Sequence, residues 1–400
     1  MSRHDRRRSK TQKRATIAGA GLLAAAAAVT TVTVASAGEP QARQKATYAV
    51  GAVFVQGNEL GGNTVHAFDR AVDGRLTPAG VYVTGGKGGD QTDAPTDSLA
   101  SQGSLVYDRP SKLLLAVNAG SGTVTSFRVR GTKLTERHVV SSSGDFPSSI
   151  AVHGRIAYVM NAGGEGSVQG FRITTKGLEP LAGSRRSLGL KNEKVPLFSS
   201  SPGQVAFTPD GRELIVTTKS ANTIEVFPVR RDGRPSARAV VNKSAGAVPF
   251  AITFDTAGRM LVAEAKDSTV STYKVRRDGV LGIVQKPLAN GQNTLCWLER
   301  AGDFFYGGNT GNSTVTGYRS RGGRLELTND VGIATPPSAM SQGVIDLAVT
   351  ADARFLYVQN ATSGTVDGFR IGRDGHLTKV STTTGLPSFA QSGMEGIVAA

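Results

Sequence analysis

The sequence predicts an all-β fold, and three observations lead to this prediction. Glycine supplies 50 of the 400 residues, which disfavours long helices. With 39% apolar and 19% charged residues, the composition is that of a folded chain. A short hairpin pattern also recurs seven times, at intervals of 44 to 59 residues, which suits a unit of four short strands. Together these features predict a seven-bladed β-propeller with four antiparallel strands per blade.

The repeated hairpin contains a Val or Ile that follows Thr or Ser and precedes an aromatic residue by three positions. The seven pairs are Val65 with Phe68, Val124 with Phe127, Val168 with Phe171, Ile224 with Phe227, Val270 with Tyr273, Val315 with Tyr318 and Val366 with Phe369. Residues three apart on a strand point to opposite faces of the sheet. Each sheet therefore needs a neighbour on both sides, which a ring of blades supplies.

The other strands of each unit are marked by apolar runs and glycine turns. A run that ends in a polar residue precedes each pair, as at 113–118 and 355–360, and an earlier run such as 250–254 supplies the inner strand. Asp-Gly follows several pairs, as at Asp73-Gly74 and Asp232-Gly233, and is a strong hairpin signal. We name the four strands A to D, with A innermost.

The two ends of the repeat predict how the ring closes. The first strand, at 48–56, resembles strand B, and the last, at 394–399, resembles strand A. We expect the C-terminal strand to complete the first blade, which removes an exposed sheet edge. Since no linker separates a further domain, residues 46–400 are predicted to form a single propeller domain.

The N-terminal segment has the features of a secretory signal. Residues 2–16 carry seven basic side chains and one acidic one, an Ala-rich run follows, and Ala35-Ser36-Ala37 suits signal peptidase. The prediction is a signal peptide at 1–37, a short disordered linker at 38–45, and a protein that is secreted or associated with the cell envelope. Both the general secretory and the twin-arginine routes stay open. No later run is long enough for a transmembrane span.

Charge and cysteine content limit the kinds of ligand and partner that are expected. Without residues 1–37 the chain has 39 basic and 30 acidic residues, an excess too mild to predict nucleic-acid binding. Cys296 is alone, and the histidines are not at metal-ligand spacing, so no disulfide, metal or cofactor is expected. We expect a monomer that takes a small molecule, with an anionic one favoured by the residual charge and the cell envelope as a further partner.

The longest loops all lie on one predicted face of the ring. Strand order places the B-to-C and D-to-A loops together, and the long ones are 84–103, 184–203, 332–343 and 383–393. We call this the loop face. Long loops on a rigid scaffold often carry binding or catalytic residues, so the site is expected here.

Candidate binding residues on the loop face are amides and cations. Gln102, Gln204, Gln342 and Gln391 lie near the starts of inner strands, where they either bind a polar ligand or satisfy backbone groups. Lys219 and Arg185 belong to a set of basic loop residues that could attract an anionic group or simply be solvated.

Glu264 is the candidate catalytic residue. It ends strand B, where the other blades have neutral polar residues: Asn118, Asn161, Thr218, Asn309 and Asn360. An ionisable group there could act as an acid or base, although residues at this position also close the turn with their own side chains. Asp346, within an apolar inner strand, is expected to be a buried acid bonded to backbone amides.

Two segments resemble the blade signature of the seven-bladed lactonase family. They are Leu-Tyr-Val-Gln-Asn-Ala-Thr-Ser-Gly-Thr-Val-Asp-Gly-Phe at 356–369 and Ala-Val-Asn-Ala-Gly-Ser-Gly-Thr-Val-Thr-Ser-Phe at 116–127. The inner-strand turn at 207–212, Phe-Thr-Pro-Asp-Gly-Arg, is also similar. The family includes propeller-type 6-phosphogluconolactonases and a fungal carboxymuconate-lactonizing enzyme. The resemblance implies a hydrolase that opens a small anionic lactone or acts on a sugar acid.

The sequence departs from this family where its enzymes carry a histidine and an acid. The corresponding segments read Phe-Ser-Ser-Ser-Pro-Gly-Gln at 198–204 and Thr-Lys-Ser-Ala-Asn at 218–222. A lactone opening that needs those groups has lost its expected acid or base. Two functions therefore stay open: a lactonase-type hydrolase, assisted by Glu264 or by a water held on a glutamine, and a non-catalytic secreted or envelope-associated binding propeller.

Overall fold

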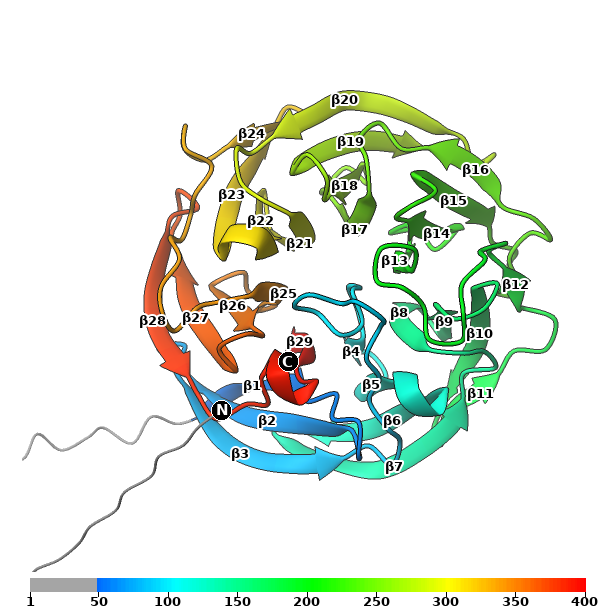
Figure 1. Ribbon diagram of the computed structural model, residues 1–400, viewed down its shortest axis with the longest axis horizontal. Helices are drawn as coiled ribbons and strands as arrows, with labels where there is room; N and C mark the ends of the chain where they lie inside the picture. Colours follow the sequence, from blue (N-terminus) through cyan, green and yellow to red (C-terminus); the bar gives the residue numbers. More distant parts are fainter. Residues whose placement is uncertain (1–48) are drawn as a thin grey trace, which may run out of the picture. The chain divides into compact units, whose positions relative to one another are not determined.

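The computed structural model describes residues 49–400 as a ring of seven four-stranded antiparallel blades around a central axis (Figure 1). The seven-bladed β-propeller prediction is thus confirmed. The predicted signal peptide and linker lie outside the described residues. In residues 49–400, no helix combines the length and apolar character needed to cross a bilayer.

Each blade follows the predicted order A, B, C and D. Blade 1 has β29 (Glu395–Ala399), β1 (Ala49–Gln56), β2 (Thr64–Ala71) and β3 (Leu76–Val83); blade 2 has β4 (Leu105–Asp108), β5 (Leu113–Asn118), β6 (Thr123–Arg130) and β7 (Lys133–Ser141); blade 3 has β8 (Pro147–His153), β9 (Ile156–Asn161), β10 (Ser167–Thr174), β11 (Gly177–Pro180) and β12 (Arg186–Ser187). In blade 3, β11 and β12 both pair with β10, so its outer strand is made of two short pieces.

The remaining blades are regular. Blade 4 has β13 (Pro202–Phe207), β14 (Glu213–Thr218), β15 (Thr223–Pro228) and β16 (Val240–Lys243); blade 5 has β17 (Pro249–Phe254), β18 (Met260–Glu264), β19 (Thr269–Val275) and β20 (Leu281–Ala289); blade 6 has β21 (Leu295–Ala301), β22 (Phe304–Asn309), β23 (Thr314–Arg321) and β24 (Arg324–Leu327); blade 7 has β25 (Val344–Val349), β26 (Phe355–Asn360), β27 (Thr365–Ile371) and β28 (Leu377–Thr383). Three short 3₁₀ turns, η1 (Ala119–Ser121), η2 (Thr310–Asn312) and η3 (Phe389–Gln391), lie on the loop face.

The ring closes as the sequence predicted. The C-terminal strand β29 pairs with β1 in the sheet order β29-β1-β2-β3, with Phe54 opposite Val398 (Figure 1). Both ends of the described chain therefore share one blade, so β1 is covered on the side that faces the axis.

The seven repeated pairs form the packing between blades. All fourteen side chains are at most 6% exposed. Phe171 packs with residues of blade 2, whereas Val168, three positions earlier on the same strand, packs with residues of blade 4. In the same way, Phe68 packs with residues of blade 7 and Val65 packs with residues of blade 2. The alternation along strand C therefore attaches each blade to both neighbours.

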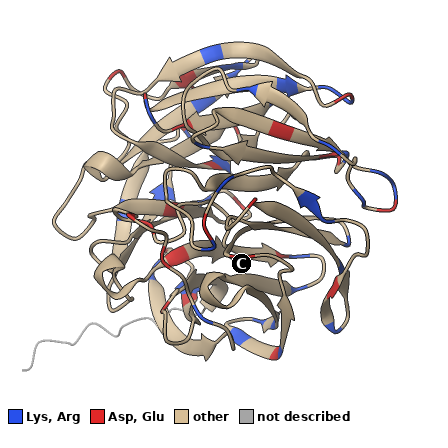
Figure 2. Cartoon of the chain, turned by 45° about the vertical axis from the view of Figure 1, so that its right-hand side comes forward, with Lys and Arg blue, Asp and Glu red and all other residues tan. Residues whose placement is uncertain are grey.

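Two of the long loops meet over the axis. Thr92 and Leu197 form an isolated parallel bridge in which the Thr92 amide donates to the Pro196 carbonyl at 3.0 Å and the Phe198 amide donates to the Thr92 carbonyl at 3.1 Å. Figure 1 shows the cyan loop before β4 running across the middle of the ring. Charged residues of both signs are interspersed over the ribbon (Figure 2), so charge alone does not select one face.

Candidate active site

A cavity of about 330 Å³ opens on the loop face, within the size range of small-molecule sites. Its walls are largely apolar, and its aromatic members are Phe198, Phe250 and Trp297. Its ionisable members are Asp97, Lys219, Lys266 and Cys296. They come from the loop bridge at 92–198 and from blades 4 to 6, so the cavity depends on contacts between segments that are far apart in the chain.

Lys219 is the buried cation of this cavity. It directly follows β14, is 3% exposed, and donates from Nζ to the Ala100 carbonyl at 2.9 Å. Its ammonium group also lies 5.2 Å from the centre of the Phe250 ring. Burial lowers the pKa of Lys219 to about 8, although the nearby Asp97 acts in the opposite direction. Lys219 can therefore change its protonation state close to neutral pH.

Asp97 and Glu395 form a buried carboxyl pair beside Lys219. Asp97 accepts hydrogen bonds from the amides of Leu99 at 2.9 Å and Ser101 at 3.2 Å, and it is hydrogen-bonded to Glu395. Glu395 in turn accepts from the Leu99 amide at 3.0 Å. Burial raises the pKa of both carboxyl groups, so the pair retains one proton between the two groups to a higher pH than isolated carboxyls would.

Two more acids lie on neighbouring inner strands. Asp346 on β25 accepts from the Leu347 amide at 2.9 Å and the Ile397 amide at 3.3 Å, as expected from its apolar strand. Burial raises the pKa of Asp346 to about 7 and that of Glu299 on β21 to about 8. Strand A of three successive blades thus carries one acid each, ending with Glu395 on β29.

Cys296 and Trp297 form one wall of the cavity. Burial raises the pKa of the Cys296 thiol to about 12, so it stays protonated and is a poor nucleophile. The Trp297 indole nitrogen donates to the Ser101 carbonyl at 3.3 Å, and its ring meets the edge of Phe250 at 5.2 Å between centres. These contacts fix the apolar surface against which a ligand would pack.

Glu264 is fully buried in its own turn and does not line the cavity. Its carboxylate accepts from the Gly246 amide at 2.7 Å, from Ser244 at 3.3 Å and from the Thr269 hydroxyl. Asn118 contacts Thr123, and Asn360 contacts Thr365, at the same five-residue spacing. Glu264 therefore occupies the position of a turn-closing residue, and its catalytic role stays a prediction.

The other predicted residues are dispersed. Gln102 reaches across the axis, where its side-chain amide donates to Glu299 at 3.1 Å and accepts from the Leu298 amide at 3.1 Å. Three glutamines satisfy local groups: Gln204 accepts from the Ile252 amide, Gln342 donates to the Ser338 carbonyl, and Gln391 caps η3. Arg185 is exposed and pairs with Glu165 at 3.0 Å.

Of the predicted ligand-binding residues, Lys219 lines the cavity. Gln102 does not line it, but lies two residues after Ala100, which is part of the cavity wall. Sequence reasoning missed Asp97, Glu299 and Glu395. A usable signal was present for the last two, because each is the single acid in a mostly apolar strand A. Asp97 carried no such signal, since Pro-Thr-Asp-Ser at 95–98 reads as an ordinary turn.

Comparison with known families decides the classification. The sequence model described as "Lactonase, 7-bladed beta-propeller" matches residues 61–298, which is more than half of the chain. The chain belongs to this lactonase family. Within this lactonase-family propeller, the match includes Asp97, Lys219 and the loop bridge, and it ends two residues after Cys296.

Solved structures share the fold of this lactonase-family propeller at low sequence identity. A periplasmic gluconolactonase of Pseudomonas aeruginosa is 18% identical, with a TM-score of 0.61 over 86% of this chain and 98% of its own. A Bacteroides uniformis protein assigned as a 6-phosphogluconolactonase is 15% identical, with a TM-score of 0.66 over 88% of this chain and 99% of its own. A Lactobacillus plantarum protein is 16% identical, with a TM-score of 0.67 over 88% and 99%. A search of curated protein sequences found no match.

Proposed function

We propose that this lactonase-family propeller hydrolyses a small lactone in the loop-face cavity. The observation that carries the proposal is the position of Lys219 and Asp97, which are buried next to one another in the wall of an otherwise largely apolar cavity. The segments that depart from the family pattern also lie here, since Phe198, Ser199 and Lys219 line the cavity. In this proposal, Asp97 and Lys219 take over the work of the missing histidine and acid.

The chemistry follows from the two charges. The Asp97 carboxylate accepts a proton from water as the water oxygen adds to the lactone carbonyl carbon. The Lys219 ammonium stabilises the negative charge that develops on the carbonyl oxygen. When the ring C–O bond breaks, the proton on Asp97 passes to the leaving alkoxide, and the product is a hydroxy acid. Protonated Glu395 holds Asp97 in place without competing for the water proton.

The cavity also limits the substrate. The rings of Phe198, Phe250 and Trp297 favour a compact ring with an apolar face. Lys266 lines the same cavity and is exposed, so it could attract an anionic substituent of the lactone. We further propose that the protein is a monomer and that it works outside the cytoplasm or at the cell envelope. The signal-like sequence of residues 1–37 supports the proposed export.

The alternative function is a binding propeller without chemistry. It is favoured by the hydrogen bonds that Lys219 and Asp97 already make, since the Ala100 carbonyl and the amides of Leu99 and Ser101 occupy part of their capacity. A carboxylate ligand would then neutralise Lys219 in the cavity without being transformed.

A lactone panel distinguishes the two functions. We expect the purified protein to open at least one small lactone, and Asp97→Asn to lower kcat by about 10²- to 10⁴-fold, the usual contribution of a general base. Glu264→Gln and Gln342→Ala are controls that leave the cavity intact, and both should retain turnover. Absence of turnover on all lactones would favour the binding function. Full activity of Asp97→Asn would show that the base lies elsewhere.

A further inference from the structure

A second pocket lies on the opposite face of the ring from the candidate active site. It has a volume of about 1020 Å³ and is lined by residues of blades 1, 2 and 7. Its basic members are Arg70, Arg109, Lys112, Arg128 and Arg130. They outnumber the two acidic side chains of the pocket, Asp69 and Asp352.

Arg70 is the unusual residue of this pocket. It is 8% exposed, and among residues 49–400 its Nε has no hydrogen-bond partner. Its guanidinium lies 5.8 Å from the centre of the Phe355 ring. Gly51 leaves the space that the group occupies, because a Cβ there would meet the Arg70 side chain. These contacts hold the Arg70 guanidinium in the pocket wall, where its terminal nitrogens can donate to an anionic ligand.

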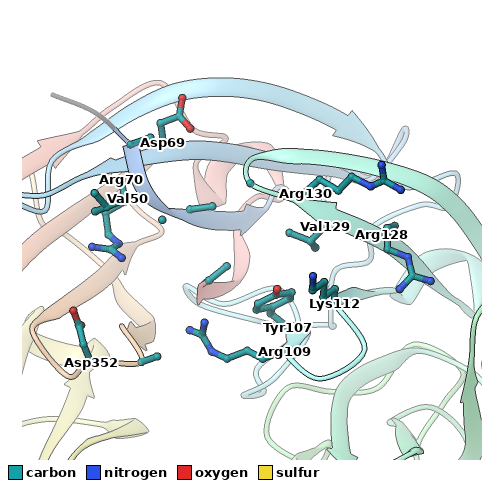
Figure 3. A pocket seen from close by; sticks show the side chains of 16 residues that line it. Val50, Asp69, Arg70, Tyr107, Arg109, Lys112, Arg128, Val129, Arg130 and Asp352 are labelled. Atoms are coloured by element: carbon teal, nitrogen blue, oxygen red, sulfur yellow. The ribbon is translucent and has the colours of Figure 1, made fainter. Parts of the chain in front are cut away.

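The other cations differ in how far they are engaged. Arg128 donates to the carbonyls of Ser111 at 2.6 Å and Thr175 at 2.9 Å, and Arg130 pairs with Glu136 at 3.7 Å. Arg109 uses one Nη to donate to the Ala399 carbonyl at 2.8 Å and is otherwise exposed. Figure 3 shows the side chains of Arg70 and Arg109 directed into the same space, while Asp69 points away from it.

We propose that this pocket binds a small multivalent anion that carries phosphate groups, with Arg70 as its buried anchor and Arg109 and Lys112 at its rim. Guanidinium groups match phosphate oxygens with paired hydrogen bonds. The cations form two groups at opposite ends of the pocket, Arg70 with Arg109 and Lys112 with Arg128 (Figure 3). This arrangement favours a ligand with more than one anionic group. The site is independent of the lactone chemistry on the loop face.

Calorimetric titration with inorganic pyrophosphate tests the proposal. Pyrophosphate should bind at least tenfold more tightly than orthophosphate, and rising salt should weaken it. Arg70→Gln should raise its Kd at least tenfold, and Arg109→Gln several-fold. Arg231→Gln, which removes an equal charge from an exposed position outside the pocket, should leave the Kd within twofold. Lactone turnover should be unchanged in Arg109→Gln.

Several results would overturn the site. They are an absence of pyrophosphate binding at millimolar concentration, an unchanged Kd in Arg109→Gln, or an equal loss in Arg231→Gln. Because Arg109 is exposed, Arg109→Gln should fold normally. It therefore tests the site even if Arg70→Gln does not fold. Competition by soluble poly(glycerol phosphate) tests the size of the ligand: failure to displace pyrophosphate supports a small phosphate compound, whereas displacement would show that the pocket accepts a phosphodiester polymer and would contradict the proposed small ligand.

Discussion

Lys219→Met is expected to lower kcat/KM for the best lactone substrate by about 10²- to 10³-fold, the usual loss when one stabilising donor is removed from a developing oxyanion. Methionine keeps the length and apolar stem of lysine, so the cavity should keep its shape. The measurement is initial-rate kinetics on purified protein. Lys266→Met is the matched control, because Lys266 lines the same cavity but is exposed; its effect should be confined to KM.

The pH profile separates a chemical role of Lys219 from a structural one. Because the pKa of Lys219 is lowered to about 8, kcat/KM should fall as the pH rises through about 8 and the ammonium group loses its proton. The acid side of the profile should rise as Asp97 ionises, at a pH above that of an ordinary aspartate. Lys219→Met should lose the alkaline fall. Persistence of that fall in Lys219→Met would assign it to another group.

Phe171→Ala is expected to reduce the free energy of unfolding by about 3 to 5 kcal/mol, the usual result of a large cavity in a packed core. Phe171 is fully buried between blades 2 and 3, among residues such as Leu113 and Ala157. Urea unfolding followed by circular dichroism measures the change.

Val241→Ala is the control for this substitution. Val241 is 62% exposed on the outer strand β16, so its truncation should cost less than about 0.5 kcal/mol. A loss below about 1 kcal/mol in Phe171→Ala would contradict the conclusion that the repeated aromatic residues hold neighbouring blades together.

The fold could be predicted because its signals are local and repeated. Val168 and Phe171 sit three positions apart on one strand, which is enough to show that both faces of the blade are covered. Turns such as Asp232-Gly233 mark strand ends without knowledge of the rest of the chain. The seven copies then reinforce one another, and the strand types at the two ends predict the closure.

The candidate site was harder to predict because it depends on contacts between distant segments. Asp97 is buried only because its loop crosses the axis and bridges Thr92 to Leu197, about 100 residues away. Lys219 looked like one of several solvated cations, yet its burial against Phe250 and Ala100 separates it from Arg185, which stays exposed. The sequence shows which of these residues can carry a charge, but it does not show which of them are buried.

A crystal structure with the hydroxy acid product of the best lactone tests the central claim most directly. We predict that the product carboxylate lies within hydrogen-bond distance of Lys219 Nζ, with the rest of the molecule against Phe250 and Trp297. A product bound elsewhere on the propeller, with the loop-face cavity empty, would contradict the assignment of this cavity as the active site.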